Sequence, residues 1–220
     1  VGLDIDLMDR LDDVTAAAAG VDAVLIATPD RAIADVASTI TPGPAVVLHC
    51  SGATSLGPVS GHDRHGSIHP LMALPSPEIG AIRLAADGWF AVAGDRLATE
   101  LVDVLGGRSF SVSDDKRALY HATAAISANH LVALLGQVER LASQVGVPLQ
   151  AFLDMAQGSL DDVAAHGAAS ALTGPAARGD NATLAAHREA LPPCEVTLYD
   201  SLVEAAQQLA TTGTLGITGC

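Results

Sequence analysis

Basic residues are scarce in this chain of 220 residues. Eleven Lys and Arg stand against 25 Asp and Glu, which gives a formal net charge of −14 at pH 7. A diffuse negative field repels phosphate groups, so nucleic acid and anionic membrane surfaces are poor partners. Hydrophobic residues make up 49% of the chain, enough to bury the core of one large domain or two small ones.

Cysteine and long apolar runs are also lacking. The three cysteines, Cys50, Cys194 and Cys220, have no C-x-x-C spacing and are odd in number. This pattern speaks against a disulfide framework and a zinc site, and it fits a reducing cytoplasm best. The most apolar stretch, Ala118–Gly136, contains two histidines and an asparagine, so we expect no membrane span.

Several motifs of other protein classes are absent. The chain begins with Val1 and has no basic segment followed by an apolar one, so we expect no secretory signal and suspect a piece of a longer protein. No G-x-S-x-G occurs, which disfavours a hydrolase triad around Ser51. His62, His65 and His69 straddle a turn and a strand without a completing Cys or Glu, so we expect no metal site.

The first half of the chain alternates between strand and helix patterns. Apolar runs at Val21–Ala27 and Ala45–His49 enclose a helical pattern at Arg31–Ile40, which predicts a β-α-β unit in a sheet buried on both faces. Further expected strands are 65–69, 88–94 and 107–112, and further expected helices are 11–19 and 95–105. We therefore expect a parallel, doubly wound sheet in residues 1–113 and an all-α domain in residues 114–220.

The helical domain opens on a long segment without proline, Asp114–Val145. It is rich in good helix formers and starts with acidic residues, so it predicts one helix about 48 Å long. Small residues recur along it and allow another backbone to approach, which suits the spine of a domain or a subunit interface. Its polar side chains are Tyr120, His121, Asn129 and His130. Each alone is typical of a satisfied core or interface residue, whereas four within three turns favour a site.

Polar residues also follow the predicted strands. Ligands bind at the carboxyl ends of strands in doubly wound sheets, so Ala27–Pro29 and Ser51–Gly52 would face a ligand, although such turns are often structural. His69 ends the third strand. We expect these residues to face the polar cluster of the long helix across a cleft between the domains. An imidazole there could exchange a proton near neutral pH, and Asn129 could orient an oxygen.

The segment Leu172–Asp180 adds a cation, Arg178, and a hydroxyl, Thr173. Arg178 could hold a substrate carboxylate. The alternative is a plain linking loop in which Asp180 caps the following helix.

Five stretches together resemble a known bacterial family: VDAVLIATPDRAIADVA, VVLHCSGATS, SIHPLMAL, LYHATAAISANHLVALLGQVERLA and LTGPAARGD. This family joins a Rossmann-like domain to the helical domain of unknown function 2520, and the match spans about Val21–Ala210. It implies kinship with dehydrogenases of the 6-phosphogluconate, pyrroline-5-carboxylate and ketopantoate type, which are often dimeric through their helices. His69-Pro70 also resembles the His-Pro of prephenate dehydrogenases, where the histidine is near the reacting centre.

The resemblance implies an oxidoreductase that uses NADP or NAD on a small carboxylated carbonyl compound or its alcohol, similar to ketopantoate reductase. The implied cofactor contacts are Ala27, Thr28, Pro29, Ser51 and Gly52; the catalytic candidates are His69, Asn129 and His130; the substrate contacts are Ser51, Tyr120, His121, Thr173 and Arg178. The family's G-x-G-x-x-G turn does not occur in these 220 residues. Its absence keeps an alternative open, a dimeric module that binds a dinucleotide or metabolite without catalysis.

Overall fold

The computed structural model describes residues 3–213. By its internal contacts the chain divides into two compact units, Val1–Leu131 and Val132–Cys220. The division therefore lies later in the chain than the change from strands to helices after residue 113, and the first turns of the long helix belong to the first unit. Cys220 lies outside the described residues.

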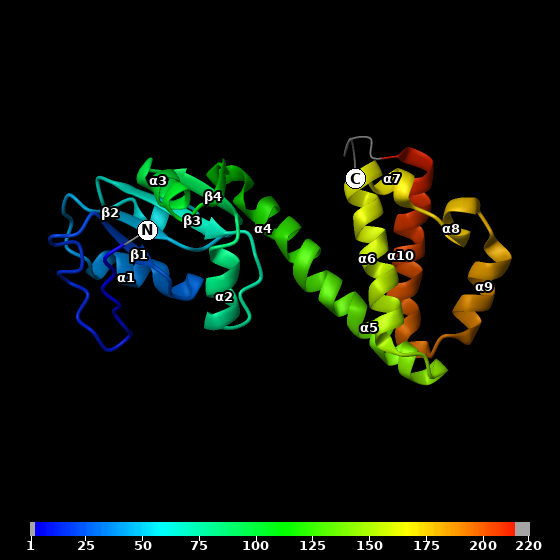
Figure 1. Ribbon diagram of the computed structural model, residues 1–220. Coiled ribbons are helices and arrows are strands. Elements are labelled where there is room, and N and C mark those ends of the chain that lie inside the picture. The colour runs from blue at the N-terminus through cyan, green and yellow to red at the C-terminus, as the bar shows by residue number, and fades with distance from the viewer. Residues whose placement is uncertain (1–2, 214–220) are drawn as a thin grey trace. The chain divides into compact units, whose positions relative to one another are not determined.

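The first unit is built on a five-stranded sheet (Figure 1). Its strands follow one another in the order of the sequence: Ala23–Ile26 (β1), Val46–His49 (β2), His65–Pro70 (β3), Trp89–Gly94 (β4) and Arg108–Ser111 (β5). The pairs β1–β2, β2–β3 and β4–β5 are parallel, while β3–β4 is antiparallel. The predicted Rossmann-like sheet is confirmed, with one antiparallel pair that the sequence pattern did not reveal.

Helices on opposite faces bury the sheet (Figure 1). Side chains of α1 (Ile33–Thr39) share one apolar cluster with Val47, and side chains of α3 (Leu97–Val104) share another with Val46 and Leu48. Because successive residues of a strand point to opposite faces, β2 feeds both clusters and is buried throughout. This burial on both faces explains why the sequence of β2 is an almost unbroken run of apolar residues.

Two details of the first unit differ from the sequence expectation. The helix expected at 11–19 is a series of turns, since the side chains of Asp9 and Asp13 accept the backbone N–H groups of Leu11 and Thr15 and so compete with helical hydrogen bonds. An additional helix, Pro77–Leu84 (α2), starts with proline in its first turn and with Ser76 accepting from the N–H of Ile79.

The long helix runs from Asp114 to Val145, as predicted. It consists of a 3₁₀ turn (Asp114–Lys116), α4 (Arg117–Ala125), a π-helical segment (Ile126–His130) and α5 (Leu131–Val145). By length and composition alone it is the one helix among residues 3–213 that could cross a membrane, a test that core helices of globular proteins also pass. The absence of a membrane span stays a prediction.

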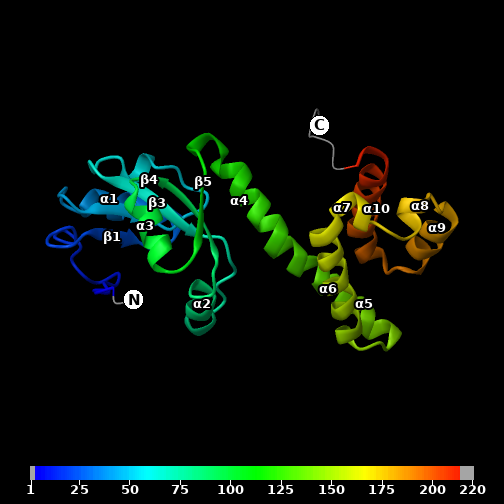
Figure 2. The ribbon, with the colours of Figure 1, turned by 45° about the horizontal axis from the view of Figure 1, so that its top comes forward.

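The second unit is entirely helical in its described part. After α5 come Leu149–His166 (α6), Ala168–Ala171 (α7), Pro175–Arg178 (α8), Asn181–Ala190 (α9) and Pro193–Thr212 (α10). Figure 2 shows α8 and α9 beside α10. Arg140 of α5 pairs with Glu195 at 2.6 Å, and Gln137 donates to the carbonyl of Glu195 at 2.9 Å, so polar contacts join α5 to the start of α10.

Gly94 offers a test of the antiparallel junction between β3 and β4. Its φ is 83°, and an added Cβ would lie 2.3 Å from the carbonyl oxygen of His65. We expect Gly94→Ala to lower the free energy of unfolding by more than about 3 kcal/mol, because conformational strain and a backbone clash add together.

Gly106→Ala is the matched control, with a φ of 74° and nothing within 4 Å of the added Cβ. Only the strain remains there, so a loss of about 1 kcal/mol is expected. Urea unfolding of both variants measures the difference, and equal losses would contradict the assigned clash.

Candidate functional site

The carboxyl ends of β1, β2 and β3 meet at one edge of the sheet. Ile26 and His49 are partners in the parallel register of β1 and β2, and His49 pairs with Ser67 of β3. The residues that follow, Ala27–Pro29 and Cys50–Gly52, therefore leave the sheet side by side, next to His69. The sequence prediction that these strand ends gather at one place agrees with this register.

Thr28 carries an unsatisfied group at this edge. Its Oγ1 is buried and has no hydrogen-bond partner within the described residues. A buried hydroxyl without a partner costs roughly 1–3 kcal/mol. Ala27 and Pro29 on either side are exposed, so the backbone at this strand end is open to a ligand.

His49 and Ser51 shape the loop after β2. The fully buried His49 accepts the Ser51 N–H at Nδ1 (3.2 Å), and its Nε2 donates to the carbonyl of Ser55 (3.2 Å). The Ser51 hydroxyl oxygen accepts the N–H groups of Ala53 (3.2 Å) and Thr54 (3.0 Å). Ser51 thus closes the turn, and burial followed by the charge of Arg117 lowers the pKa of His49.

Gly52 lies against two imidazole rings. A Cβ at this position would be 2.8 Å from Cε1 and Nε2 of His69 and 3.0 Å from Cδ2 of His121. Only glycine leaves room for both rings here. The space beside Nε2 of His69 is therefore kept free of a side chain by Gly52.

His69 and Tyr120 form a hydrogen-bonded pair. Nδ1 of His69 is 2.7 Å from the Tyr120 hydroxyl, and the rings meet edge to face with centroids 5.6 Å apart. A phenol O–H is a strong donor and the bare nitrogen of a neutral imidazole is a strong acceptor, so we assign Tyr120 as the donor and Nδ1 as the acceptor. The imidazole proton is then on Nε2, which faces Gly52.

A buried arginine connects the loop after β2, the strand β3 and the long helix. Arg117, 3% exposed, donates from Nε to Oδ1 of Asp114 (2.8 Å) and from a terminal nitrogen to the Ser67 hydroxyl of β3. Asp114 in turn accepts the backbone N–H of Leu56 at 3.1 and 3.2 Å. The loop after β2, the strand that bears His69 and the helix that bears Tyr120 are joined through one guanidinium.

Burial sets the protonation states of the pair. Desolvation, then the charges of His121 and Arg117, lower the pKa of His69 to about 4. Desolvation raises the pKa of Tyr120 to about 12, against the opposing effect of Arg117. At neutral pH both side chains are uncharged. His69 therefore differs from the expected imidazole that titrates near pH 7, and it acts there as a neutral donor and acceptor.

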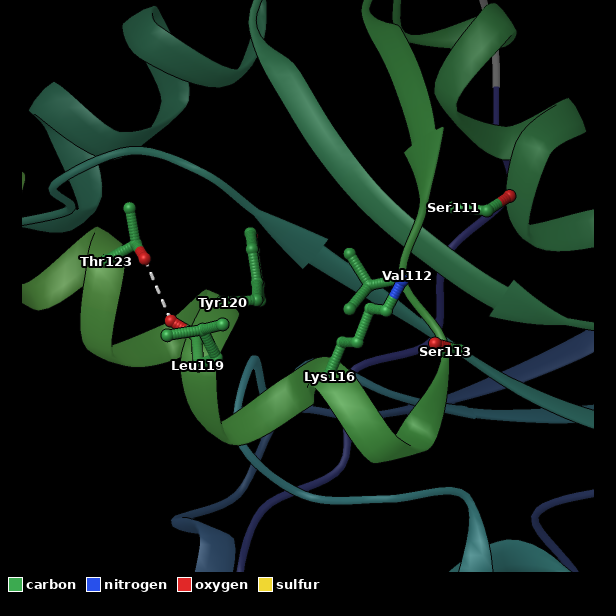
Figure 3. A pocket seen from close by; sticks show the side chains of 7 residues that line it. All are labelled: Ser111, Val112, Ser113, Lys116, Leu119, Tyr120 and Thr123. Carbon is green, nitrogen blue, oxygen red and sulfur yellow. Dashed lines mark hydrogen bonds between the residues drawn. The ribbon is translucent and has the colours of Figure 1, made fainter. Parts of the chain in front are cut away.

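A cavity of about 450 Å³ adjoins Tyr120 (Figure 3). It is open to solvent and is lined by Ser111, Val112, Ser113, Lys116, Leu119, Tyr120 and Thr123. Thr123 donates its hydroxyl to the Leu119 carbonyl at 2.9 Å, so it does not compete for Tyr120 (Figure 3). Sequence reasoning found only Tyr120 of this set. Lys116 and Thr123, one helical turn on either side of Tyr120, could have been found from that spacing.

The roles of Asn129, His130, Thr173 and Arg178 stay predictions. Asn129 and His130 are exposed on the π-helical segment, and neither contacts His69 among the contacts of the described residues. Thr173 and Arg178 belong to the second unit, where Asp180 caps α9 by accepting the N–H of Thr183 (3.1 Å), as the loop alternative expected. Within residues 3–213 no three His, Cys, Asp or Glu side chains form a group that could hold a metal ion.

The described fold defines a Rossmann-like α/β unit followed by a helical unit. The profile of the domain of unknown function DUF2520 matches residues 88–206, more than half of the chain. The chain belongs to this family, as its sequence motifs suggested. None of the curated proteins matches it significantly.

Solved structures share the fold. Protein TM1727 from Thermotoga maritima is 26% identical with a TM-score of 0.70, over 85% of this chain and 77% of its own. An imine reductase from Myxococcus stipitatus in complex with NADP⁺ is 13% identical with a TM-score of 0.61, over 92% and 79%. A reductive aminase from Aspergillus terreus, in complex with NADPH4, cyclohexanone and allyl amine, is 16% identical with a TM-score of 0.59, over 88% and 76%. At the two lower identities the likeness concerns the fold.

Gly52→Ala tests the crowding around His69. The added methyl must displace one of the two rings, so we expect the imidazole signals of His69 to shift in histidine ¹H–¹⁵N spectra and the free energy of unfolding to fall by about 1–2 kcal/mol. Gly61→Ala is the control, since nothing lies within 4 Å of its added Cβ, and it should stay within about 0.5 kcal/mol of the parent. Unshifted His69 signals in Gly52→Ala would refute the contact.

The low pKa of His69 predicts a pH dependence of stability. The unfolded chain binds a proton on His69 near pH 6.5, whereas the folded chain does so only near pH 4. The unfolded state therefore holds more protons between these values, and stability must fall as the pH drops from 6.5 to 4. His69→Asn should lose less stability than the parent over this range in urea unfolding at pH 7, 6, 5 and 4. Parallel curves would show that His69 titrates normally.

Proposed function

We propose that this protein is an oxidoreductase that uses NADP(H), or NAD(H), to interconvert a small carboxylated carbonyl compound and its alcohol. The observation that carries the proposal is the His69–Tyr120 pair, placed beside Gly52 at the carboxyl edge of a Rossmann-like sheet. Ligands of such sheets bind at this edge. A ketopantoate-like acid is the substrate class that the family resemblance favours.

The residues present fit the nicotinamide end of a dinucleotide. Thr28 offers a buried hydroxyl without a protein partner, and Gly52 keeps the neighbouring strand end free of a side chain. Ala27 and Pro29 expose the backbone between them. A bound NADP(H) would supply or accept the hydride. The reductase and aminase with a similar fold were solved with NADP⁺ and with NADPH4, which supports this choice.

His69 would hold the substrate oxygen. With Nδ1 occupied by Tyr120, Nε2–H can donate to a carbonyl oxygen, and a neutral imidazole can polarise a carbonyl without a positive charge. His121, 6.2 Å away between ring centroids, borders the same space. Asn129, His130, Thr173 and Arg178 are proposed as further substrate contacts, with Arg178 matched to a carboxylate.

We also propose a cytoplasmic homodimer formed through the helical unit. Its helices expose apolar side chains: Val132, Val145, Met155, Leu160, Val163, Leu198 and Leu202. Exposed apolar side chains of this kind are the material from which a subunit interface can be built. Light scattering after gel filtration should give twice the mass of the chain.

The second candidate is a binding module without catalysis. The pKa values of His69 and Tyr120, about 4 and about 12, both lie far from neutrality, whereas acid–base catalysts are usually tuned toward it. A module of this kind would bind the dinucleotide and turn over no substrate.

The test uses the protein as its gene encodes it and asks whether NADPH reduces ketopantoate or pyruvate. The loss of NADPH absorbance at about 340 nm measures the reaction. We expect His69→Asn to lower kcat by about 100-fold or more, since it removes the imidazole N–H proposed to hold the substrate oxygen. His130→Ala decides whether a second imidazole takes part, and unchanged turnover would remove His130 from the mechanism. NADPH binding without turnover of either acid would favour the binding module.

A further inference from the structure

Tyr120 connects His69 to the solvent side of the molecule. Its hydroxyl bonds Nδ1 of His69, while the same residue lines the open cavity shown in Figure 3. His69 itself is only partly exposed, and Gly52 and His121 flank the side of its ring that faces the proposed substrate. When Nε2 gives its proton to the substrate, a new proton can therefore reach the imidazole through the phenol and Nδ1.

One neighbour of Tyr120 offsets part of the cost of a short-lived negative charge on its oxygen. The buried Arg117 begins α4 one turn before it, and Lys116 lies on the cavity wall. The charge of Arg117 favours the phenolate and so opposes the burial that raises the pKa of Tyr120. The charged or titratable groups that act on His69 from its neighbours are His121 and Arg117 on the helix, Asp30 after β1 and His49 on β2. Asp30 is the one anion among them.

We propose that Tyr120 and His69 form a proton relay between the cavity and the substrate oxygen, an inference that rests on the proposed function. Tyr120 is then a positioning and relay residue, because it acts on the substrate through His69. This role goes beyond the substrate contact that the sequence suggested for it.

The relay balances in the direction of reduction. The oxygen of the reduced substrate takes the proton of Nε2 as that N–H bond breaks, and Nδ1 takes the proton of Tyr120 as the phenol O–H bond breaks. Water in the cavity then gives a proton to the phenolate. The imidazole returns to its first tautomer when Nδ1 releases its proton to water and Nε2 takes one from water. The alcohol gains one proton, water loses one, and the pair ends as it began. Oxidation runs the same steps in reverse.

Tyr120→Phe is the decisive variant because it keeps the ring and removes only the relayed proton. With ketopantoate and NADPH as probes, we expect kcat to fall by about 10- to 100-fold with KM within about threefold, and the solvent deuterium isotope effect on kcat to shrink. In ¹⁵N spectra of the protein without ligands, His69 should change from a single Nε2–H tautomer to a mixture, and its pKa should rise.

The chain provides a matched control in Tyr199. Its hydroxyl lies 3.0 Å from Nδ1 of His187, with ring centroids 6.2 Å apart. This exposed pair in the second unit has the same kind of Tyr–His contact as Tyr120 and His69. Tyr199→Phe should leave kcat, KM and the isotope effect unchanged.

The outcomes separate the relay from the proposed function. If the parent protein reduces ketopantoate and Tyr120→Phe does so at the same kcat, or if His69 keeps its single tautomer in Tyr120→Phe, the relay is wrong and the oxidoreductase stands. If the parent binds NADPH but reduces no probe, the proposed function fails and the relay fails with it. A lower kcat with an unchanged isotope effect assigns Tyr120 a purely structural role and overturns the relay.

Discussion

The guanidinium of Arg117 is the contact on which the arrangement of the site depends. It is buried, and it bonds both Asp114 and the hydroxyl of Ser67, while Asp114 holds the backbone of the loop after β2. A buried charge is costly unless it is paired and hydrogen-bonded, so each of these contacts constrains the others. The loop, the third strand and the long helix cannot move apart without exposing or orphaning that charge.

The same cation also modifies the pKa values that burial sets. It adds to burial in lowering the pKa of His49 and His69, and it opposes burial at Tyr120. The His69–Tyr120 pair is thus neutral and lies near a fixed positive charge that Asp114 pairs. Such a site can orient an oxygen by hydrogen bonds and can pass a proton through a chain of neutral groups, and it needs no residue that titrates near pH 7.

Much of the fold followed from patterns in the sequence. The five strands, α1, α3 and the extent of the long helix were predicted, because burial on both faces gives unbroken apolar strands and because helix formers without proline continue a helix. The antiparallel pairing of β4 was not, since pairing direction depends on how the chain returns around α2 rather than on the residues of the strand. The turns at 11–19 escaped prediction because aspartate side chains competed for the backbone there.

The candidate site divides in the same way. The sequence alone proposed Thr28, Gly52, His69, Tyr120 and His121, since residues at strand ends and polar groups on an apolar helix stand out against their neighbours. Only the tertiary structure decided that His69 and Tyr120 form a hydrogen bond, that Gly52 must lack a side chain, and that Arg117 is buried and bonds Ser67. These contacts join residues from different strands, loops and helices, and a local pattern carries no information about such contacts or about the desolvation that keeps His69 and Tyr120 neutral.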